Sequence, residues 1–218
     1  MEQDFWLRRW NKGDIGFHRD AIHAYLKQNW PSLKLGSGAT VFVPLCGKAR
    51  DMIWLAEQGY KVVGVELSPI AVADFFAEHN LSPDLRNDGP FTISTYGAFE
   101  IWCGDIFDLP SHVWQRIDGV YDRASLVAFP PQLQEKYADL LGEHLPSKAP
   151  IFLISLSYDP TEITGPPFSV TDQAIQQLFE TNFDIAHVTS RDGMDDNKNL
   201  RERGLSALQE SLYVLKKR

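Results

Sequence analysis

Short apolar runs alternate with helix-like segments along this chain. Short runs rich in apolar residues predict five strands, over 40–44, 61–66, 99–103, 119–121 and 151–157, and the first of these has no charged residue. Apolar residues at helical spacing predict helices over 48–58, 69–80, 131–145 and 171–181. Two further strands, over 183–188 and 211–215, complete the pattern, whereas polar residues over 82–97 indicate a loop or an irregular hairpin. This alternation predicts an α/β fold with a doubly wound sheet.

The segment before the first strand has a different character. Residues 5–29 have a helical pattern that is interrupted around Gly13 and Gly16, and we predict a helical lid over 1–35. Trp10 and Phe17 flank the interruption, where they are suited to stack on a flat ligand. The segment has four aromatic residues of this kind: Phe5, Trp6, Trp10 and Phe17. The alternative is that the rings only dock the segment on the sheet, and we prefer this alternative for Phe5 and Trp6.

Composition narrows the class of protein. A length of 218 residues suits one domain, predicted over 1–218, and 29 acidic against 21 basic residues disfavour a nucleic-acid partner. No apolar stretch reaches the roughly 17–25 residues that a membrane span needs. We expect no secretory signal at the N-terminus. A chain of this length with only two cysteines is typical of a reducing compartment. His18 and His23 lack the spacing of a metal pair, so we expect surface or core histidines and no metal. We expect a soluble, cytoplasmic monomer without a membrane partner.

Functional residues are expected after the strands, because ligands of doubly wound sheets bind beyond the carboxyl ends of the strands. The first strand runs into PLCGKA (44–49), whose single glycine, Gly47, matches neither a dinucleotide motif nor a Walker loop. Such a turn suits a ligand without a pyrophosphate. The second strand ends in Glu66, 19 residues after Gly47, where nucleoside-binding sheets place an acid that accepts hydrogen bonds from the ribose. The alternative is a solvated loop acid.

Later strand ends carry further candidates. The third predicted strand leads into Asp105 and Ile106, which are suited to border an adenine; the alternative is that Asp105 or Asp108 caps a helix. The fourth ends at Arg123, which is suited to neutralise an anionic substrate in a cleft, unless it only pairs with an acid such as Asp122. After the fifth, the proline-rich stretch 165–168 is either a wall of a substrate pocket or an ordinary crossover loop.

Together these segments resemble the thiopurine S-methyltransferases. The resemblance rests on PLCGKA (44–49), GVE (64–66), IFDLP (106–110), YDRASLVA (121–128), LSYDP (156–160) and GPPF (165–168), preceded by WxxGxxGFH (10–18). The short N-terminal extension resembles the bacterial members. The resemblance implies a Rossmann-like methyltransferase fold that uses S-adenosylmethionine (SAM). It also implies a seven-stranded mixed sheet with an antiparallel last strand and helices on both faces.

The resemblance further implies roles for single residues in holding SAM. Trp10 is expected against the methionine end, and Leu45 contributes its backbone at the first turn. Glu66 is expected to bind the ribose hydroxyls, and Ile106 to border the adenine. Arg123 is expected where cofactor and substrate meet.

The substrate side involves fewer residues. The resemblance places Phe17 as a wall for the aromatic substrate and gives Arg123 a part in substrate binding and catalysis. Asp14, in the interrupted segment, is a second catalytic candidate that would relay a proton.

The expected reaction is methyl transfer from SAM to the sulfur of aromatic or heterocyclic thiols such as thiopurines, with selenium and tellurium species as further candidate acceptors. An acidic heteroaryl thiol needs no strong general base, which agrees with a sequence without an evident Ser/His/Asp or Cys/His set. Two alternatives stay open: a SAM-dependent methyltransferase that acts on another small oxygen or nitrogen acceptor, and a module that binds SAM without catalysis.

Overall fold

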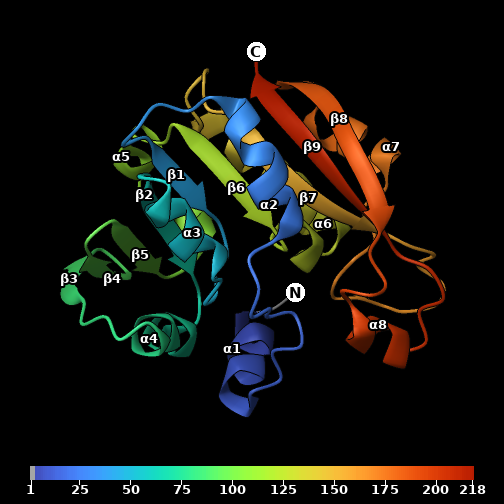
Figure 1. Cartoon of the computed structure of the whole chain (residues 1–218), viewed down its shortest axis with the longest axis horizontal. Coiled ribbons are helices and arrows are strands. Elements are labelled where there is room, and N and C mark those ends of the chain that lie inside the picture. Colours follow the sequence, from blue (N-terminus) through green and yellow to red (C-terminus); the bar gives the residue numbers. More distant parts are fainter. Residues whose placement is uncertain (1–2) are drawn as a thin grey trace. The chain divides into compact units, whose positions relative to one another are not determined.

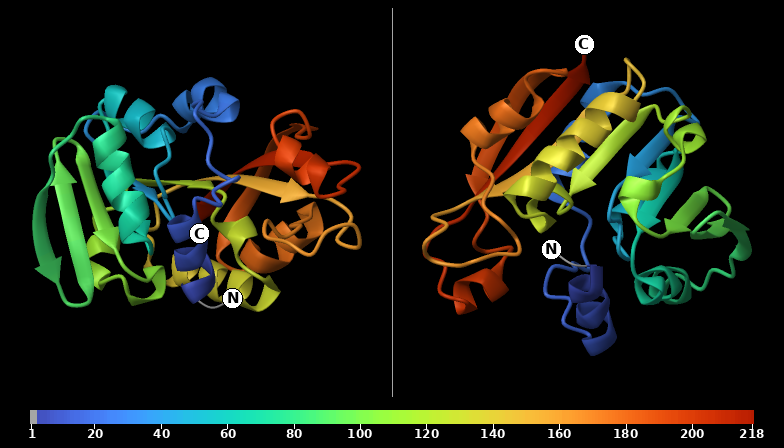
Figure 2. Two further views of the ribbon diagram at one scale, coloured as in Figure 1. Left: turned by 90° about the horizontal axis from the view of Figure 1, so that it is seen from below. Right: turned by 180° about the vertical axis from the view of Figure 1, so that it is seen from behind.

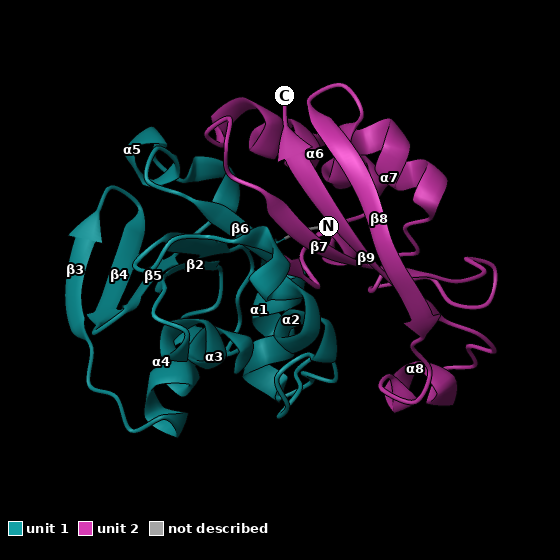
Figure 3. Ribbon diagram, turned by 45° about the horizontal axis from the view of Figure 1, so that its top comes forward, with its two compact units in different colours: residues 1–121 teal, residues 122–218 magenta. Residues whose placement is uncertain are grey.

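The computed structural model describes residues 3–218. They form two compact units, coloured teal and magenta in Figure 3: unit 1 comprises the described residues up to Tyr121, and unit 2 comprises Asp122–Arg218. Residues 1 and 2, where the predicted lid begins, lie outside the described part. The single domain over 1–218 stays a prediction.

Unit 1 is built on a mixed set of strands in the order β3-β4-β5-β2-β1-β6 (Figure 1). Neighbours among β5, β2, β1 and β6 pair in parallel, whereas β3, β4 and β5 pair antiparallel. The carboxyl ends of β1, β2 and β5 therefore meet at one edge, as predicted. The bounds are β1 (Thr40–Val43), β2 (Lys61–Glu66), β3 (Asp84–Asp88), β4 (Phe91–Tyr96), β5 (Phe99–Cys103) and β6 (Gly119–Arg123). The last two residues of β6, Asp122 and Arg123, belong to unit 2.

Helices cover both faces of these strands. Phe99 and Trp102 point to opposite faces of β5, because side chains alternate along a strand. Phe99 packs against Phe75 of α4 with ring centroids 5.3 Å apart, and Trp102 packs against His112 of α5 at 5.8 Å. The helices of unit 1 are α1 (Gln3–Lys12), α2 (Ala24–Asn29), η1 (Trp30–Leu33), α3 (Asp51–Glu57), α4 (Pro69–Glu78), η2 (Ile106–Asp108) and α5 (Ser111–Trp114).

Local sequence signals explain where α3 and α4 lie. Ser68 caps α4, since its Oγ accepts a hydrogen bond from the backbone N–H of Ala71 at 3.3 Å, and Pro69 occupies the first turn. Gly59 follows α3 with a φ of +87°, which few other residues adopt. Both helix ends were predicted from these residues.

Unit 2 contains strands in the order β7-β9-β8, with β9 antiparallel to both neighbours. This confirms that the last strand is antiparallel. The elements that lie entirely in unit 2 are η3 (Leu126–Ala128), α6 (Pro131–His144), β7 (Ile151–Ser157), α7 (Asp172–Phe179), β8 (Phe183–Asp192), α8 (Lys198–Glu202) and β9 (Gln209–Lys217). In the part of the chain that the structure describes, no helix is both long and apolar enough to pass through a bilayer.

The strand count corrects the sequence-based expectation. Residues 3–218 contain nine strands, where the resemblance implied seven. The additional pair is the hairpin of β3 and β4, at one edge of unit 1 (green in Figure 2). Phe91 and Ile93 of β4 are buried while Thr92 between them is exposed, which is the alternation of a half-buried strand. Its polar neighbours hid this alternation in the sequence.

Candidate functional site

The acid at the end of β2 is buried and connects two loops. Glu66 is 6% exposed. Its Oε2 accepts a hydrogen bond from the backbone N–H of Gly47 at 2.8 Å, and its Oε1 accepts one from Ser68 at 2.8 Å. A carboxylate offers about four acceptor positions, and the backbone amides of Gly47, Ser68 and Leu67 all face this one, so capacity for a further donor remains. The alternative of a solvated loop acid is wrong.

Burial controls protonation around this carboxylate. It raises the pKa of Glu66, although the amides of Ser68 and Gly47 oppose the shift. Burial also raises the pKa of the Cys103 thiol to about 11 and that of Cys46 well above its ordinary value, and the charge of Glu66 adds to both shifts. Both thiols are free and stay protonated at neutral pH, so they are uncharged neighbours of Glu66 and not nucleophiles.

The turn after β1 is fixed by backbone contacts. The N–H of Cys46 donates to the carbonyl of Val65 at 2.9 Å, which ties the turn to β2. Leu45 and Gly47 both have positive φ, +44° and +51°. A Cβ at Gly47 would lie 3.3 Å from Cζ2 of Trp10, so glycine lets the indole lie directly against the turn. Trp10 itself is 6% exposed.

The end of α1 and the segment after it form an aromatic cluster. Phe17 packs edge-on against Trp6 and Trp10, each with ring centroids 5.7 Å apart. The guanidinium of Arg9 lies 5.5 Å from the Phe17 centroid and pairs with the carboxylate of Asp14 at 3.0 Å. Phe17 therefore contacts Trp10, and Trp10 lies against the turn after β1. Asp14 forms an ion pair with Arg9.

The loop after β5 begins with a helix cap. Asp105 caps η2, since its Oδ1 accepts a hydrogen bond from the N–H of Phe107 at 3.0 Å. Ile106, the first residue of η2, is buried. The N–H of Gly104 donates to the carbonyl of Glu66 at 2.9 Å, which joins this loop to the end of β2. Of the two capping positions considered, Asp105 is the one that caps a helix, and the adenine role of this loop stays a prediction.

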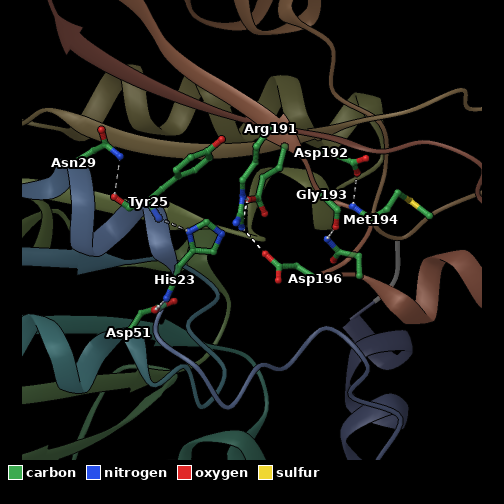
Figure 4. Close-up of polar contacts among 11 residues, drawn as sticks. His23, Tyr25, Asn29, Asp51, Arg191, Asp192, Gly193, Met194 and Asp196 are labelled. Atoms are coloured by element: carbon green, nitrogen blue, oxygen red, sulfur yellow. Dashed lines mark hydrogen bonds and ion pairs between the residues drawn. The ribbon is translucent and has the colours of Figure 1, made fainter.

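A second buried acid, which the sequence did not single out, stands at the start of α3. Asp51 accepts hydrogen bonds from the backbone N–H of His23 at 2.8 Å and from the hydroxyl of Tyr121 at 3.0 Å. Figure 4 shows the former contact, together with the one from the N–H of Tyr25 to Nδ1 of His23 at 3.2 Å. His23 is therefore a buried capping residue, in line with the expected core histidine. The one signal for Asp51 in the sequence was its position in the first turn of a helix, where acidic residues are common.

In unit 2, the residue before Arg123 is a buried acid that accepts several hydrogen bonds. Arg123 is the last residue of β6, and the preceding Asp122 is fully buried. The Asp122 carboxylate accepts hydrogen bonds from the Tyr137 hydroxyl at 2.7 Å and the Ser125 N–H at 3.3 Å. Burial raises the pKa of Asp122 to about 6 against these hydrogen bonds. Ala124 has a φ of +70°, so the turn after Arg123 has a conformation that non-glycine residues rarely adopt.

The proline-rich loop of unit 2 is anchored from two directions. The Tyr158 hydroxyl donates to the carbonyl of Pro167 at 2.5 Å, and the Arg203 guanidinium donates to the carbonyl of Pro166 at 2.8 Å. Residues 165–168 are thus held in place by the segments after β7 and α8.

A further cluster of unit 2, shown in Figure 4, connects β8 to the loop that follows it. The guanidinium of Arg191 contacts the carboxylate of Asp196 at 2.5 Å and that of buried Glu210 at 2.6 Å. The N–H of Met194 donates to the carboxylate of Asp192 at 2.8 Å. These contacts stabilise the loop between β8 and α8.

Solved structures show what class of fold this is. A SAM-dependent methyltransferase from Anabaena variabilis matches with a TM-score of 0.65 at 15% identity, covering 99% of this chain and 95% of that one. The magnesium protoporphyrin IX methyltransferase of Synechocystis, solved with bound S-adenosylhomocysteine (SAH), matches with a TM-score of 0.65 at 13% identity, covering 99% and 100%. The chain therefore has the Rossmann-like fold of SAM-dependent methyltransferases, as expected.

Sequence relatives define the family. The model of the family described as "Thiopurine S-methyltransferase (TPMT)" matches residues 1–218. The thiopurine S-methyltransferase of Pseudomonas entomophila is 44% identical over 99% of both chains, and that of Azotobacter vinelandii is 42% identical over 100% of both. The chain belongs to the thiopurine S-methyltransferase family, which confirms the resemblance seen in the sequence. The individual roles assigned to Trp10, Leu45, Glu66, Ile106, Phe17, Arg123 and Asp14 stay predictions.

Proposed function

We propose that this chain transfers a methyl group from SAM to the sulfur of aromatic and heterocyclic thiols, thiopurines among them. Membership of the family makes the chain a SAM-dependent methyltransferase. The observation that carries the proposal is the Glu66 carboxylate at the end of β2, 2.8 Å from the amide of Gly47 in the turn after β1.

The residues of unit 1 fit a sulfonium nucleoside. Glu66 would accept a hydrogen bond from the ribose in addition to those from the backbone amides around it. The turn after β1 has one glycine, with the Trp10 ring against it, which leaves little room for a pyrophosphate. SAM has no pyrophosphate, so this restriction suits it.

Four residues of unit 1 would hold the cofactor. Glu66 would bind the ribose, and the backbone at Leu45 would contact the cofactor at the turn after β1. Buried Ile106 would border the adenine, and the Trp10 indole would lie against the methionine end. Apolar contact from Trp10 and Ile106 would complement the polar contact from Glu66.

SAM supplies a methyl group on a good leaving group when it is bound, so the protein chiefly has to align an acceptor behind that methyl. Alignment alone contributes roughly 7–11 kcal/mol in favourable cases. Phe17 would hold the aromatic ring of the thiol by packing. Arg123 would neutralise the thiolate or purine anion and so orient its sulfur, at the position where cofactor and substrate meet.

The sequence assigns two further roles. A proton relay by Asp14 would serve only acceptors that are not ionised on binding, and a thiol that binds as its anion would not need it. Residues 1–35 would act as a lid that excludes water from the reacting groups. The aromatic cluster of Trp6, Trp10 and Phe17 supports a lid with an apolar inner side.

The setting of the reaction is part of the proposal. Two free cysteines support a cytoplasmic location, because thiols stay reduced there. We take the working form to be a monomer, since the exposed large apolar side chains that the structure describes are spread over four different elements: Ile70, Leu85, Tyr96 and Val188. Selenium and tellurium species are further candidate acceptors once reduced to selenide or telluride, because these anions are soft nucleophiles like a thiolate.

A panel of acceptors with labelled SAM tests the proposal. We expect the label on the sulfur of 6-mercaptopurine, and weaker labelling in parallel reactions with selenite or tellurite that an excess of a thiol reductant has first reduced. A catechol and an aromatic amine serve as oxygen and nitrogen acceptors. Transfer to these two alone would replace the proposal with an O- or N-methyltransferase. Binding of SAH without transfer to any acceptor would indicate a module without catalysis.

A further inference from the structure

We infer that Arg9 is a positioning residue for the substrate wall: through its ion pair with Asp14 it fixes the segment that carries Phe17. The inference rests on the proposed function, because it concerns the same aromatic substrate. It assigns a task to Arg9, and with a thiol substrate it gives Asp14 a positioning task, separate from the proton relay proposed for acceptors that are not ionised.

Arg9 and Asp14 are joined at three points. Nη2 of Arg9 contacts Oδ1 of Asp14 at 3.0 Å, and Nε donates to the backbone carbonyl of Asp14 at 2.9 Å. In the reverse direction the backbone N–H of Asp14 donates to the carbonyl of Arg9 at 2.9 Å. One guanidinium thus binds both the side chain and the main chain of one residue, which fixes the turn at the end of α1.

The same guanidinium lies among aromatic rings. Its Cζ atom is 5.8 Å from the ring centroid of Phe5, 5.9 Å from that of Trp6 and 5.5 Å from that of Phe17. The side chain of Arg9 is only 20% exposed, whereas that of Asp14 is 64% exposed. A cation that is partly removed from water interacts more strongly with ring faces, so Arg9 stabilises the cluster by cation–π contact as well as by packing.

Phe17 is therefore held at two levels. Its backbone follows Asp14 by three residues, and the Arg9 contacts fix where that stretch begins. Its ring touches Trp6 and Trp10 and is covered by Arg9. Loss of the guanidinium releases the chain and the ring together.

The contact also changes the interpretation of Asp14. Its carboxylate is engaged by Arg9 and serves as the counter-ion that orients the guanidinium. A proton relay predicts that Asp14 matters for the rate of reaction and its pH dependence. A positioning role predicts that Asp14 and Arg9 act on aromatic-substrate binding and depend on each other.

A double-mutant cycle separates these roles. The variants are Arg9→Met, Asp14→Asn and their combination, with Arg9→Lys to restore the charge. Arg8→Met is the matched control, since Arg8 is exposed on the same helix. For each protein we would measure KM and kcat for 6-mercaptopurine across pH, the calorimetric Kd for SAH, and hydrogen exchange of residues 11–18 without any substrate.

We expect Arg9→Met and Asp14→Asn each to raise KM by roughly five- to tenfold, with kcat and the Kd for SAH changed less than twofold. The combined variant should be no worse than the weaker-binding single variant, Arg9→Lys should recover part of the loss, and Arg8→Met should match wild type. Exchange over residues 11–18 should accelerate in both single variants.

Three results would overturn the inference: effects on KM that multiply in the combined variant, unchanged exchange over 11–18, or a loss of kcat with an altered pH profile in Asp14→Asn alone. The last would assign the proton relay to Asp14. Because hydrogen exchange needs no substrate, it tests the coupling even if wild type fails to methylate a thiol, and that failure would count against the proposed function instead.

Discussion

Gly47 donates its backbone hydrogen bond to the carboxylate of Glu66 over 2.8 Å, so the turn after β1 is held by the acid that ends β2. The other oxygen of Glu66 holds Ser68 at the entrance to α4. The acid proposed to bind the ribose thus also shapes the loops around it. A change at Glu66 should affect both folding stability and cofactor binding.

Glu66→Gln should destabilise the folded protein. A glutamine side chain has one acceptor oxygen and one NH2 group, so either Gly47 or Ser68 would face a donor and lose its partner inside the protein. An unsatisfied buried group costs about 1–3 kcal/mol. Urea unfolding should show this loss relative to wild type, and a variant of unchanged stability would mean that the two hydrogen bonds contribute little.

Gly47→Ala should weaken SAH binding as well as stability. The φ of +51° strains any residue with a Cβ, and the new methyl group would lie 3.3 Å from the Trp10 ring. Gly38→Ala is the matched control, because Gly38 has a φ of +77° but open space around its Cβ position. Both should lose about 1–2 kcal/mol through backbone strain. Only Gly47→Ala should displace Trp10 and raise the Kd for SAH. Equal SAH affinity in the two variants would show that Trp10 tolerates the shift.

The contribution of Asp122 to the free energy of unfolding should decrease as pH rises. Its pKa is about 6 in the folded protein against an ordinary value of 3.8, because burial disfavours the charged form. The folded state therefore binds this proton more tightly than the unfolded state does. The contribution is fully present below about pH 4 and is lost as pH rises through about 6.

The difference in unfolding free energy between wild type and Asp122→Asn isolates this contribution, since asparagine does not titrate. The wild type should lose about 2–3 kcal/mol relative to the variant between pH 4 and pH 7. Chemical unfolding at a series of pH values measures it. A constant difference, or one that grows in favour of wild type at higher pH, would contradict a raised pKa.

Arg123→Ala should lower kcat/KM for 6-mercaptopurine by roughly 10- to 100-fold, as the loss of a charge-assisted hydrogen bond to an anion implies. Arg123→Lys should recover only part, because lysine lacks the planar fork of donors. Arg116→Ala, which breaks an ion pair with Glu100, is the control for loss of a positive charge. If steady-state kinetics gave the same kcat/KM for all three variants, Arg123 would have no role in the reaction.

Much of the fold was predictable because its signals are local. Consecutive residues predict the buried strand that ends in Glu66 and the helix that starts at Ser68 and Pro69. The structure has the same strand bounds and the same helix start. The hairpin of β3 and β4 was not resolved, since short polar strands with few buried residues look like loops. Short α5 and α8 span too few residues for helical periodicity to show.

The site was predictable in its residues but not in its contacts. Position after a strand singled out Glu66 and Arg123, and the sequence could not show that Glu66 holds Gly47 or that Tyr137 binds Asp122. Those partners are 19 and 15 residues apart, and only the folded chain brings them together. The Arg9–Asp14 pair escaped notice for another reason, since the sequence does not show that the chain turns back at Gly13.

Calorimetric titration of SAH into wild type and Glu66→Ala tests the central claim, that the acid at the end of β2 binds the nucleoside. Glu57→Ala serves as control, because it removes an exposed acid at the end of α3. We predict that Glu66→Ala, if shown to be folded at the temperature of titration, binds SAH about 5- to 100-fold more weakly, with Glu57→Ala unchanged. Equal affinity in wild type and folded Glu66→Ala would contradict the claim.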